Sequence, residues 1–486
     1  MTSQKTSEMP GKLGQALRAE SKRSRVPASF RDRDGFVYFD AEHGILRQVN
    51  RSYQQSFEQL MKSGLYDLLV KREMLVAHEE ESLSRRLDDE AFAVLRPNRI
   101  PFISYPYEWS FNALKDAALL TLDIQSLALE RGLTLKDASA YNVQFVGAKP
   151  IFIDTLSFVA REPGQAWAAY GQFCRHFLAP LALMAKRDIR LQKLLASHID
   201  GIPLDLTGRL LPKKCWFSLG LVMHIYLHAM AVERNGRGGG GAEGGKKSAK
   251  VSDNGLKAII ANLRRVVERL EWQPKNSTWS NYYNEHTYTS ESEAQKLKCV
   301  EDALKQVRPS VVWDIGANTG LYSRLAAKYA DTVIAFDYDP LCVDRLYQHT
   351  RQSQESIVSL VMDLANPSAA IGWANQERSS LVERGPADLT LALAVMHHIV
   401  IGNNVPLDDL AAFFWQTSRN VVIEFVPPED VQVQRLLRTR KELPHPYSKE
   451  EFERAFSRHF ELVRHTEITD GDAAGRILYL ARRKGE

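Results

Sequence analysis

The chain has 486 residues, of which 63 are basic and 59 acidic, so its formal net charge is only +4. This length predicts about two to four domains, and a hydrophobic content of 44% supplies enough apolar side chains for folded cores. The near balance of charge argues against a nucleic-acid partner, which usually requires a concentrated basic surface. Four widely spaced cysteines form no C-x-x-C pair, so we expect no zinc site, no disulfide framework and a reducing, cytoplasmic environment.

The first thirty residues carry scattered lysines and arginines among serines and threonines, without the apolar stretch of a secretory signal. We therefore expect residues 1–30 to be a disordered basic lead. Residues 31–232 form the first expected domain. Within it, a leucine-rich stretch predicts a helix over 114–131, which Gly132 ends.

Three polar residues follow this helix in the order Asp, Asn, Asp. Asn142 comes five residues after Asp137, and Asp154 comes twelve residues after Asn142. A short hairpin at Gly147 reverses the chain, so the apolar run that ends at Asp154 is expected to lie beside Asn142. Phosphoryl transfer needs one carboxylate to orient a hydroxyl, and an amide oxygen with a second carboxylate to hold Mg²⁺. A capped turn in a helical domain explains the same residues, because Asp and Asn favour turns.

Through Lys136-Asp137, Asn142 and Ile153-Asp154, this region resembles the superfamily of protein kinases and aminoglycoside phosphotransferases. The resemblance implies an α+β kinase-like domain over 31–232. It also implies that Asp137 is the catalytic carboxylate, that Asn142 and Asp154 bind Mg²⁺, and that ATP is the phosphate donor.

Two features of that superfamily are missing. The hairpin expected between Gly35 and Asn50 has no G-x-G-x-x-G loop, and the phosphate-binding lysine has only positional candidates, Lys62 and Lys71. A degenerate kinase fold that serves as a recognition module therefore stays open beside an active phosphotransferase.

Residues 215–232 contain no Lys, Arg, Asp or Glu, and their number approaches the length of a membrane span. Polar residues dilute the stretch, so we expect a buried helix of a globular domain and no membrane span. His224 and His228 are spaced as zinc ligands on one helix face, but the glutamate of a zincin motif is missing. We interpret both as core histidines.

A change of composition divides the chain. Residues 233–255 are rich in glycine and lysine, which predicts a flexible linker. Apolar residues at helical spacing then predict an amphipathic helix over 256–270, which we expect to pack on the core of the second domain, 256–486. An aromatic cluster that either covers a pocket or simply packs comes next, formed by Trp279, Tyr282, Tyr283, His286 and Tyr288.

An apolar strand over 311–315 runs into a turn bounded by Gly316 and Gly320, where the backbone can approach a ligand closely. The next strand, 331–336, ends in Asp337, where an acidic residue can bind a ribose diol. A dinucleotide site requires the spacing G-x-G-x-x-G, which this turn lacks, and Asp314 would repel its phosphates. A cationic cofactor with an amino-acid tail suits Asp314 better.

Through Asp314-Ile315-Gly316-Ala317-Asn318-Thr319-Gly320 and Ala335-Phe336-Asp337-Tyr338-Asp339, the C-terminal half resembles the class I S-adenosylmethionine-dependent methyltransferases. The resemblance implies a Rossmann-like α/β fold with a seven-stranded, mostly parallel sheet, preceded here by the kinase-like domain. Further strands are expected over 356–360, 389–396, 420–426, 460–463 and 476–480.

The same resemblance implies the residues that bind S-adenosylmethionine. Asp314 and Gly316 line the methionine end, with Asn318 in the same turn, and Gly320 permits tight packing of the helix on the strand. Asp337 takes the ribose hydroxyls. Asp363, after the third apolar run, takes the adenine amino group.

The apolar run over 389–396 predicts a buried parallel strand that ends in His397 and His398, at the edge where open α/β sheets bind ligands. Either imidazole can act as a base near the transferred methyl group, because histidine titrates near neutral pH. A histidine that only shapes the pocket is the alternative, since methyl transfer to a strong nucleophile needs mainly positioning.

Three functions follow from these patterns. The first is methyl transfer to an acceptor that no stretch of the sequence identifies. Enzymes that join kinase-like and methyltransferase modules suggest a saccharide or lipid-linked saccharide, and a protein or small metabolite stays open. The second is a bifunctional kinase and methyltransferase. The third is a non-catalytic binding scaffold with a vestigial cofactor pocket.

Overall fold

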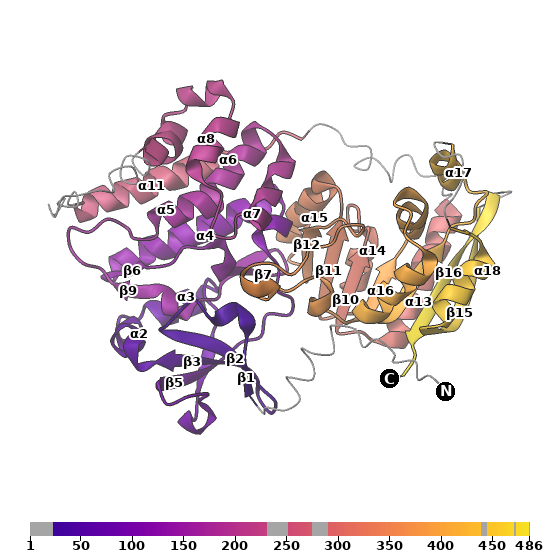
Figure 1. Cartoon of the computed structure of the whole chain (residues 1–486), viewed down its shortest axis with the longest axis horizontal. Helices are drawn as coiled ribbons and strands as arrows, with labels where there is room; N and C mark the ends of the chain where they lie inside the picture. The colour runs from indigo at the N-terminus through magenta and orange to yellow at the C-terminus, as the bar shows by residue number, and fades with distance from the viewer. Residues whose placement is uncertain (1–22, 231–250, 275–289, 439–444, 471–472, 486) are drawn as a thin grey trace, which may run out of the picture.

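The computed structural model describes residues 23–230, 251–274, 290–438, 445–470 and 473–485, which form two halves that lie next to each other along the long axis (Figure 1). We call residues 23–274 the N-terminal half and residues 290–485 the C-terminal half. The predicted aromatic cluster and most of the predicted linker lie outside the described residues. All four cysteines are described, and none of them is in a disulfide.

The N-terminal half begins with an antiparallel sheet in the order β1-β2-β3-β5-β4. Its strands are β1 (Arg23–Arg25), β2 (Gly35–Asp40), β3 (Gly44–Asn50), β4 (His78–Glu81) and β5 (Ala91–Pro97). The predicted disordered lead, 1–30, is therefore too long, because its residues 23–25 form β1, which pairs with β2. An ion pair of 2.8 Å between Arg23 Nε and Asp40 Oδ2 supports this pairing.

A long helix, α4, is the centre of the rest of this half. The predicted helix is confirmed as Phe111–Glu130. At its start, the Ser110 hydroxyl accepts a hydrogen bond from the Ala113 amide. After its end, Gly132 has a φ of +73°. The other helices are α2 (Gln54–Lys62), α3 (Leu65–Lys71), α5 (Tyr170–Phe173), α6 (Ala179–Lys186), α7 (Leu194–Ser197) and α8 (Leu204–Leu210). Two small antiparallel sheets follow: β6 (Leu133–Leu135) pairs with β9 (Phe158–Ala160), and the hairpin of β7 (Val143–Val146) and β8 (Lys149–Phe152) lies between them in the sequence.

The apolar stretch 215–232 is not the single buried helix that the sequence predicts. Its described part begins with a 3-10 turn, η9 (Lys213–Phe217). A continuous helical segment follows over 219–230, in which α9 (Leu219–Leu221) leads into the π-helical η10 (Val222–Leu227) and residues 228–230 return to α-helical geometry. Only its inner side is buried. Within the described residues, no helix combines the length and apolar character that crossing a lipid bilayer requires.

The amphipathic helix after the linker is present as α11 (Asp253–Arg269), but it packs on α4 and α9 of the N-terminal half. Arg264 pairs with Asp123 on α4, and Lys115 Nζ donates to the carbonyl oxygen of Leu270 at 2.9 Å. This corrects the expectation that the helix packs on the second domain. Its apolar stripe predicts that it packs, but not against which surface.

The C-terminal half contains a seven-stranded sheet in the order β12-β11-β10-β13-β14-β16-β15. The first five strands in this order are parallel, and β16 runs antiparallel to both of its neighbours. The strands are β10 (Val311–Ile315), β11 (Thr332–Asp337), β12 (Ile357–Val361), β13 (Ala387–Ala392), β14 (Ser418–Phe425), β15 (Phe460–Asp470) and β16 (Ala473–Arg483). The helices are α13 (Ser290–Val307), α14 (Leu321–Ala326), α15 (Pro340–Ser353), α16 (Leu407–Thr417), α17 (Val431–Leu437) and α18 (Lys449–Ser457).

One hydrophobic core runs across both halves. Phe102 of the N-terminal half packs edge-on against Trp313 of β10, with ring centroids 5.8 Å apart, and against Phe336 of β11 at 6.0 Å. The boundary also contains a buried ion pair, in which Arg384 contacts the two carboxylate oxygens of Glu108 at 2.6 and 2.9 Å. The two halves therefore form one packed body.

Candidate functional site

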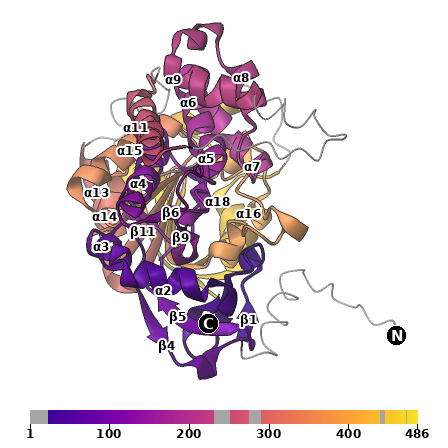
Figure 2. The ribbon, with the colours of Figure 1, turned by 90° about the vertical axis from the view of Figure 1, so that its left-hand side faces the viewer.

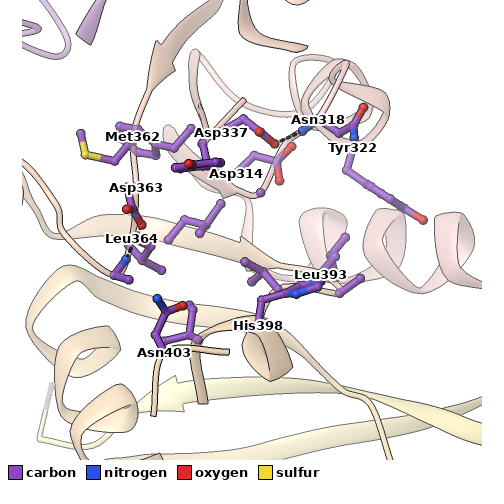
Figure 3. A pocket seen from close by; sticks show the side chains of 18 of the residues that line it. Asp314, Asn318, Tyr322, Asp337, Met362, Asp363, Leu364, Leu393, His398 and Asn403 are labelled. Atoms are coloured by element: carbon purple, nitrogen blue, oxygen red, sulfur yellow. Dashed lines mark hydrogen bonds between the residues drawn. The ribbon is translucent and has the colours of Figure 1, made fainter. Parts of the chain in front are cut away.

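A cavity of about 430 Å³ lies at the carboxyl ends of the parallel strands of the C-terminal half (Figure 3). Ligands of open α/β sheets bind at this edge, because the loops after the strands meet there. The cavity wall includes Asp314, Gly316, Asn318, Asp337 and Asp363. These are five of the six residues that the sequence assigns to a cofactor. The sheet thus brings together three strand ends that are far apart in the sequence.

The turn after β10 has a backbone that only a few residue types tolerate. Gly316 and Gly320 have φ values of +75° and +86°, and Asn318 between them has +51°. A Cβ atom on Gly320 would lie 2.3 Å from the side chain of Leu346 on α15, so glycine at this position lets the start of α14 pack against α15. Gly320 is not among the residues that line the cavity, and its part in the site is to place the turn.

Two carboxylates, Asp314 and Asp337, lie near each other in the cavity at the ends of the neighbouring strands β10 and β11 (Figure 3). Asp337 accepts hydrogen bonds from the backbone amides of Asn318 at 2.7 Å and Asp339 at 2.8 Å, which fix its orientation. Asp314 accepts a hydrogen bond of 2.5 Å from the Ser323 hydroxyl. Burial raises the pKa of Asp314 to about 7 and the pKa of Asp337 to about 6. A bound cation or hydroxyl donor would favour the ionised form of both.

The loop after β12 supplies the opposite wall. Asp363 is held by a hydrogen bond of 2.9 Å from the Ala365 amide to its Oδ1 atom, and Met362 beside it also lines the cavity. The Met362 sulfur accepts from the Ser368 amide at 3.4 Å. The Ser368 hydroxyl in turn donates to Glu108 at 2.5 Å. The N-terminal half therefore supports this wall of the cavity.

The sequence predicts that His397 and His398 directly follow a strand, but in the structure they do not. Strand β13 ends at Ala392, four residues early, and Ala394 turns the chain with φ +53° before the π-helical segment η13 (His398–Gly402) begins. Of the two imidazoles, His398 lines the cavity, whereas His397 is 2% exposed and lies behind the wall. Burial lowers the pKa of both, so both are neutral at neutral pH.

Sequence reasoning missed a charged residue in the wall, Lys296 of α13. Its Nζ atom donates to Glu424 Oε2 at 2.7 Å, and both side chains are buried. Arg476 lies 3.7 Å from the other oxygen of Glu424 and donates to Asp430 at 2.9 Å. Burial lowers the pKa of Lys296. The available signal was the place of Lys296 on the buried stripe of an amphipathic helix.

The N-terminal half brings its three predicted residues together. The Asn142 side chain donates to the Ser157 hydroxyl at 3.4 Å. Burial and the nearby charge of Asp154 raise the pKa of Asp137, and the neighbouring Asn142 partly offsets this. Arg47 of β3 forms an ion pair with Asp154. Although burial alone would raise the pKa of Asp154, Arg47 and the Ser157 hydroxyl hold it below its usual value.

The predicted phosphate-binding lysines do not join this cluster. Lys62 pairs with Glu58 on the exposed side of α2, and Lys71 is exposed at the end of α3. Among the residues that the structure describes, no three His, Cys, Asp or Glu side chains gather as a metal site. The cation beside Asp154 is Arg47.

The fold and the cavity define the C-terminal half as a Rossmann-like α/β domain with a ligand site at the carboxyl edge of its sheet. The whole chain is 35% identical over 446 residues to nodulation protein NoeA of Rhizobium meliloti (strain 1021), and the aligned region covers 90% of this chain and 92% of that protein. The chain therefore belongs to the NoeA family of nodulation proteins. No protein-family model matches the chain.

Similarity to solved structures is weaker. The N-methyltransferase NodS from Bradyrhizobium japonicum WM9, in complex with S-adenosyl-L-homocysteine, matches with a TM-score of 0.31 and 12% identity over 43% of this chain and 100% of that one. The bifunctional kinase-methyltransferase WbdD matches with a TM-score of 0.30 and 18% identity, over 42% of this chain and 41% of that one. The fold assignment rests instead on the chain's own strand order.

Proposed function

We propose that this chain transfers a methyl group from S-adenosylmethionine, which binds in the cavity at the carboxyl ends of β10 to β13. The observation that carries the proposal is the convergence of five residues, assigned to this cofactor from the sequence, on one cavity. Its volume of about 430 Å³ suits a ligand the size of a nucleoside with an amino-acid tail.

The residues present fit that cofactor. Gly316 and Asn318 line the cavity, and both have positive φ values, so the chain turns there and its backbone faces the space where a ligand would lie. Asp314 offers a carboxylate to an ammonium group. Asp337, oriented by two backbone amides, offers two oxygens to a ribose diol. Asp363 lies on the wall where an adenine amino group would reach it.

His398 is the residue that we assign to proton transfer. When bound, the cofactor supplies an electrophilic methyl group on a positively charged sulfur. Because burial lowers the pKa of His398, its imidazole is neutral and able to accept a proton from an attacking hydroxyl or amine. His397 lies behind it, with ring centroids 4.2 Å apart, and supports its position.

The acceptor that we propose is a small molecule or glycan, with a saccharide or lipid-linked saccharide as the leading class. The cavity wall supports this choice, because the apolar side chains of Leu393 and Ile399 lie beside the polar groups of His398 and Asn403. Such a mixture suits a sugar ring, which has apolar faces and a hydroxyl rim.

The experiment is label transfer from methyl-tritiated cofactor to an extract of the source cells, with separation of the labelled product into lipid, glycan and protein fractions. We expect His398→Gln to lower kcat about a hundredfold while the affinity for S-adenosylhomocysteine is unchanged. The control is His349→Gln, at an exposed histidine on α15. No label incorporation above a boiled sample would overturn the proposal.

Phosphoryl transfer by the N-terminal half is the second candidate, and the structure fits it less well. A divalent cation held by Asn142 and Asp154 would have to displace Arg47, which already neutralises the Asp154 carboxylate. We therefore derive no step through Mg²⁺ or ATP. Titration of the full chain with ATP or GTP in the presence of Mg²⁺ decides the point, and saturable binding that Asp154→Ala abolishes would restore the bifunctional alternative.

A further inference from the structure

The segment from Lys213 to Met230 exposes an apolar surface, which we call the outer apolar face. Its six members are each at least 40% exposed: Trp216, Phe217, Leu219, Met223, Leu227 and Met230. Phe217 is 93% exposed and Leu219 is 76% exposed. Exposed sides of helical segments in soluble proteins are ordinarily polar, so a contiguous apolar surface of this kind indicates a binding surface.

The outer apolar face is held rigidly by the side of the segment that points inward. Leu221 and Ile225 are buried, and a Cβ atom on Gly220 would lie 2.2 Å from Val266 of α11, so the backbone packs tightly there. His224 is hydrogen-bonded on both ring nitrogens, to the Tyr170 hydroxyl at 2.8 Å and the Asn262 side chain at 2.7 Å.

The spacing of the outer residues shows that they form one stripe. Leu219, Met223, Leu227 and Met230 follow one another at intervals of four, four and three residues, which places them along one side of a helical segment. Trp216 extends the stripe toward its start and stacks on Tyr226, with ring centroids 4.1 Å apart. The face is thus a fixed ridge of aromatic and aliphatic side chains.

The charged residues of this segment are all basic, and the acidic Asp205 on α8, which packs on η10, is paired with Arg209. Lys213 and Lys214 are exposed just before the buried Cys215 and the exposed Trp216, and the sequence has no acidic residue between Asp205 and Glu233. Lys186 of α6 also lies close enough to interact with Cys215 inside the segment. An apolar ridge beside lysines is complementary to a surface with an apolar interior and a negatively charged outer layer.

We propose that the outer apolar face docks onto an anionic membrane surface, with Phe217 and Leu219 inserted between the lipids and Lys213 and Lys214 at the headgroups. Tryptophan, phenylalanine and leucine beside lysine are typical of segments that lie in the membrane interface without crossing it. The α9 turn lies at one end of the N-terminal half, beside α8 and opposite the five-stranded sheet (Figure 2), where a flat surface can reach it. Docking at this face is independent of the proposed methyl transfer.

The test is cosedimentation of the full chain with sucrose-loaded vesicles of phosphatidylcholine, with or without an equal part of phosphatidylglycerol. We expect binding to the anionic vesicles, weakened by salt. The double variant Phe217→Ser and Leu219→Ser should bind at least about tenfold more weakly. Reversing both lysines, Lys213→Glu with Lys214→Glu, should remove the preference for phosphatidylglycerol.

A matched control changes the exposed pair Phe39 and Ile45, which lie opposite each other on β2 and β3, to serine. It should bind vesicles as the unaltered protein does. The proposal is overturned if the unaltered protein stays in the supernatant, or if the Phe217 and Leu219 variant binds as well as the control. If the unaltered protein is a dimer that does not bind vesicles, and the Phe217 and Leu219 variant is a monomer, the face serves self-association and the proposal is also overturned.

Discussion

Replacing Arg384 by methionine should destabilise the whole chain, because it leaves the Glu108 carboxylate without its cation at the boundary between the halves. The side chains of Arg384 and Glu108 are 5% and 1% exposed. Removing one partner of a buried pair costs about 3 to 5 kcal/mol of unfolding free energy. Two donors to Glu108 remain, the Tyr105 amide at 2.9 Å and the Ser368 hydroxyl at 2.5 Å, so we expect the lower end, about 3 kcal/mol.

Equilibrium unfolding in urea, followed by circular dichroism, measures this loss. The matched control is Arg419→Met, whose partner Asp388 is 3.5 Å away and whose side chain is 52% exposed, and it should cost less than about 1 kcal/mol. Adding Glu108→Gln to the Arg384 variant should restore part of the stability, because the unpaired buried charge is removed. Equal losses for Arg384→Met and Arg419→Met would refute the reasoning.

Further predictions concern three charged groups, Asp314, Lys296 and Asp154. Because burial raises the pKa of Asp314 to about 7, ligand affinity should rise about tenfold between about pH 6 and pH 8, measured with S-adenosylhomocysteine. In the folded protein without ligand, Asp314 binds its proton more tightly than in the unfolded chain, where the carboxyl pKa is 3.8. The unfolding free energy of the ligand-free protein should therefore fall as the pH rises from about 6 to 8. A ligand affinity or an unfolding free energy that does not change with pH would contradict the corresponding prediction. Lys296→Met should cost about 3 kcal/mol of unfolding free energy in urea, because it leaves Glu424 buried without this cation. Lys305→Met, at an exposed i,i+4 pair on the same helix, should leave the unfolding free energy almost unchanged, and equal costs for the two variants would argue against a buried pair. Asp154→Ala should destabilise the chain by about 2 kcal/mol by leaving Arg47 unpaired, with methyl transfer by the folded fraction unchanged; an unchanged urea midpoint would contradict this.

The strands of the C-terminal half were predictable because near-continuous apolar runs of this length, separated by helical patterns, are typical of buried parallel strands. The turn from Gly316 to Gly320 was predictable for a different reason, since the local backbone there requires glycine. In both cases the information is contained in a few adjacent residues.

Contacts between distant residues were not predictable in this way. The partners Glu108 and Arg384 are 276 positions apart, and neither residue type indicates burial by itself. The stripe of α11 predicts a buried side but not its neighbour, which proved to be α4. Lys296 was overlooked because a lysine is rarely buried unless it is paired, and its partner lies on a strand far along the chain.

The outer apolar face illustrates the same limit. The absence of charged residues over 215–232 predicted burial, because apolar side chains ordinarily lie inside. Segment η10 has its inner side in the core and its outer side in solvent, and only the fold distinguishes the two. Composition alone gives no orientation.

Calorimetric titration of the full chain with S-adenosylhomocysteine tests the central claim most directly. We expect one saturable site, with affinity about a hundredfold lower in Asp337→Ala, because two charge-assisted hydrogen bonds to the ribose are lost. Asp331→Ala, at the opposite end of the same segment, should bind as the unaltered protein does. No binding by the unaltered protein, or equal affinity in all three proteins, would contradict the assignment of this cavity to the cofactor.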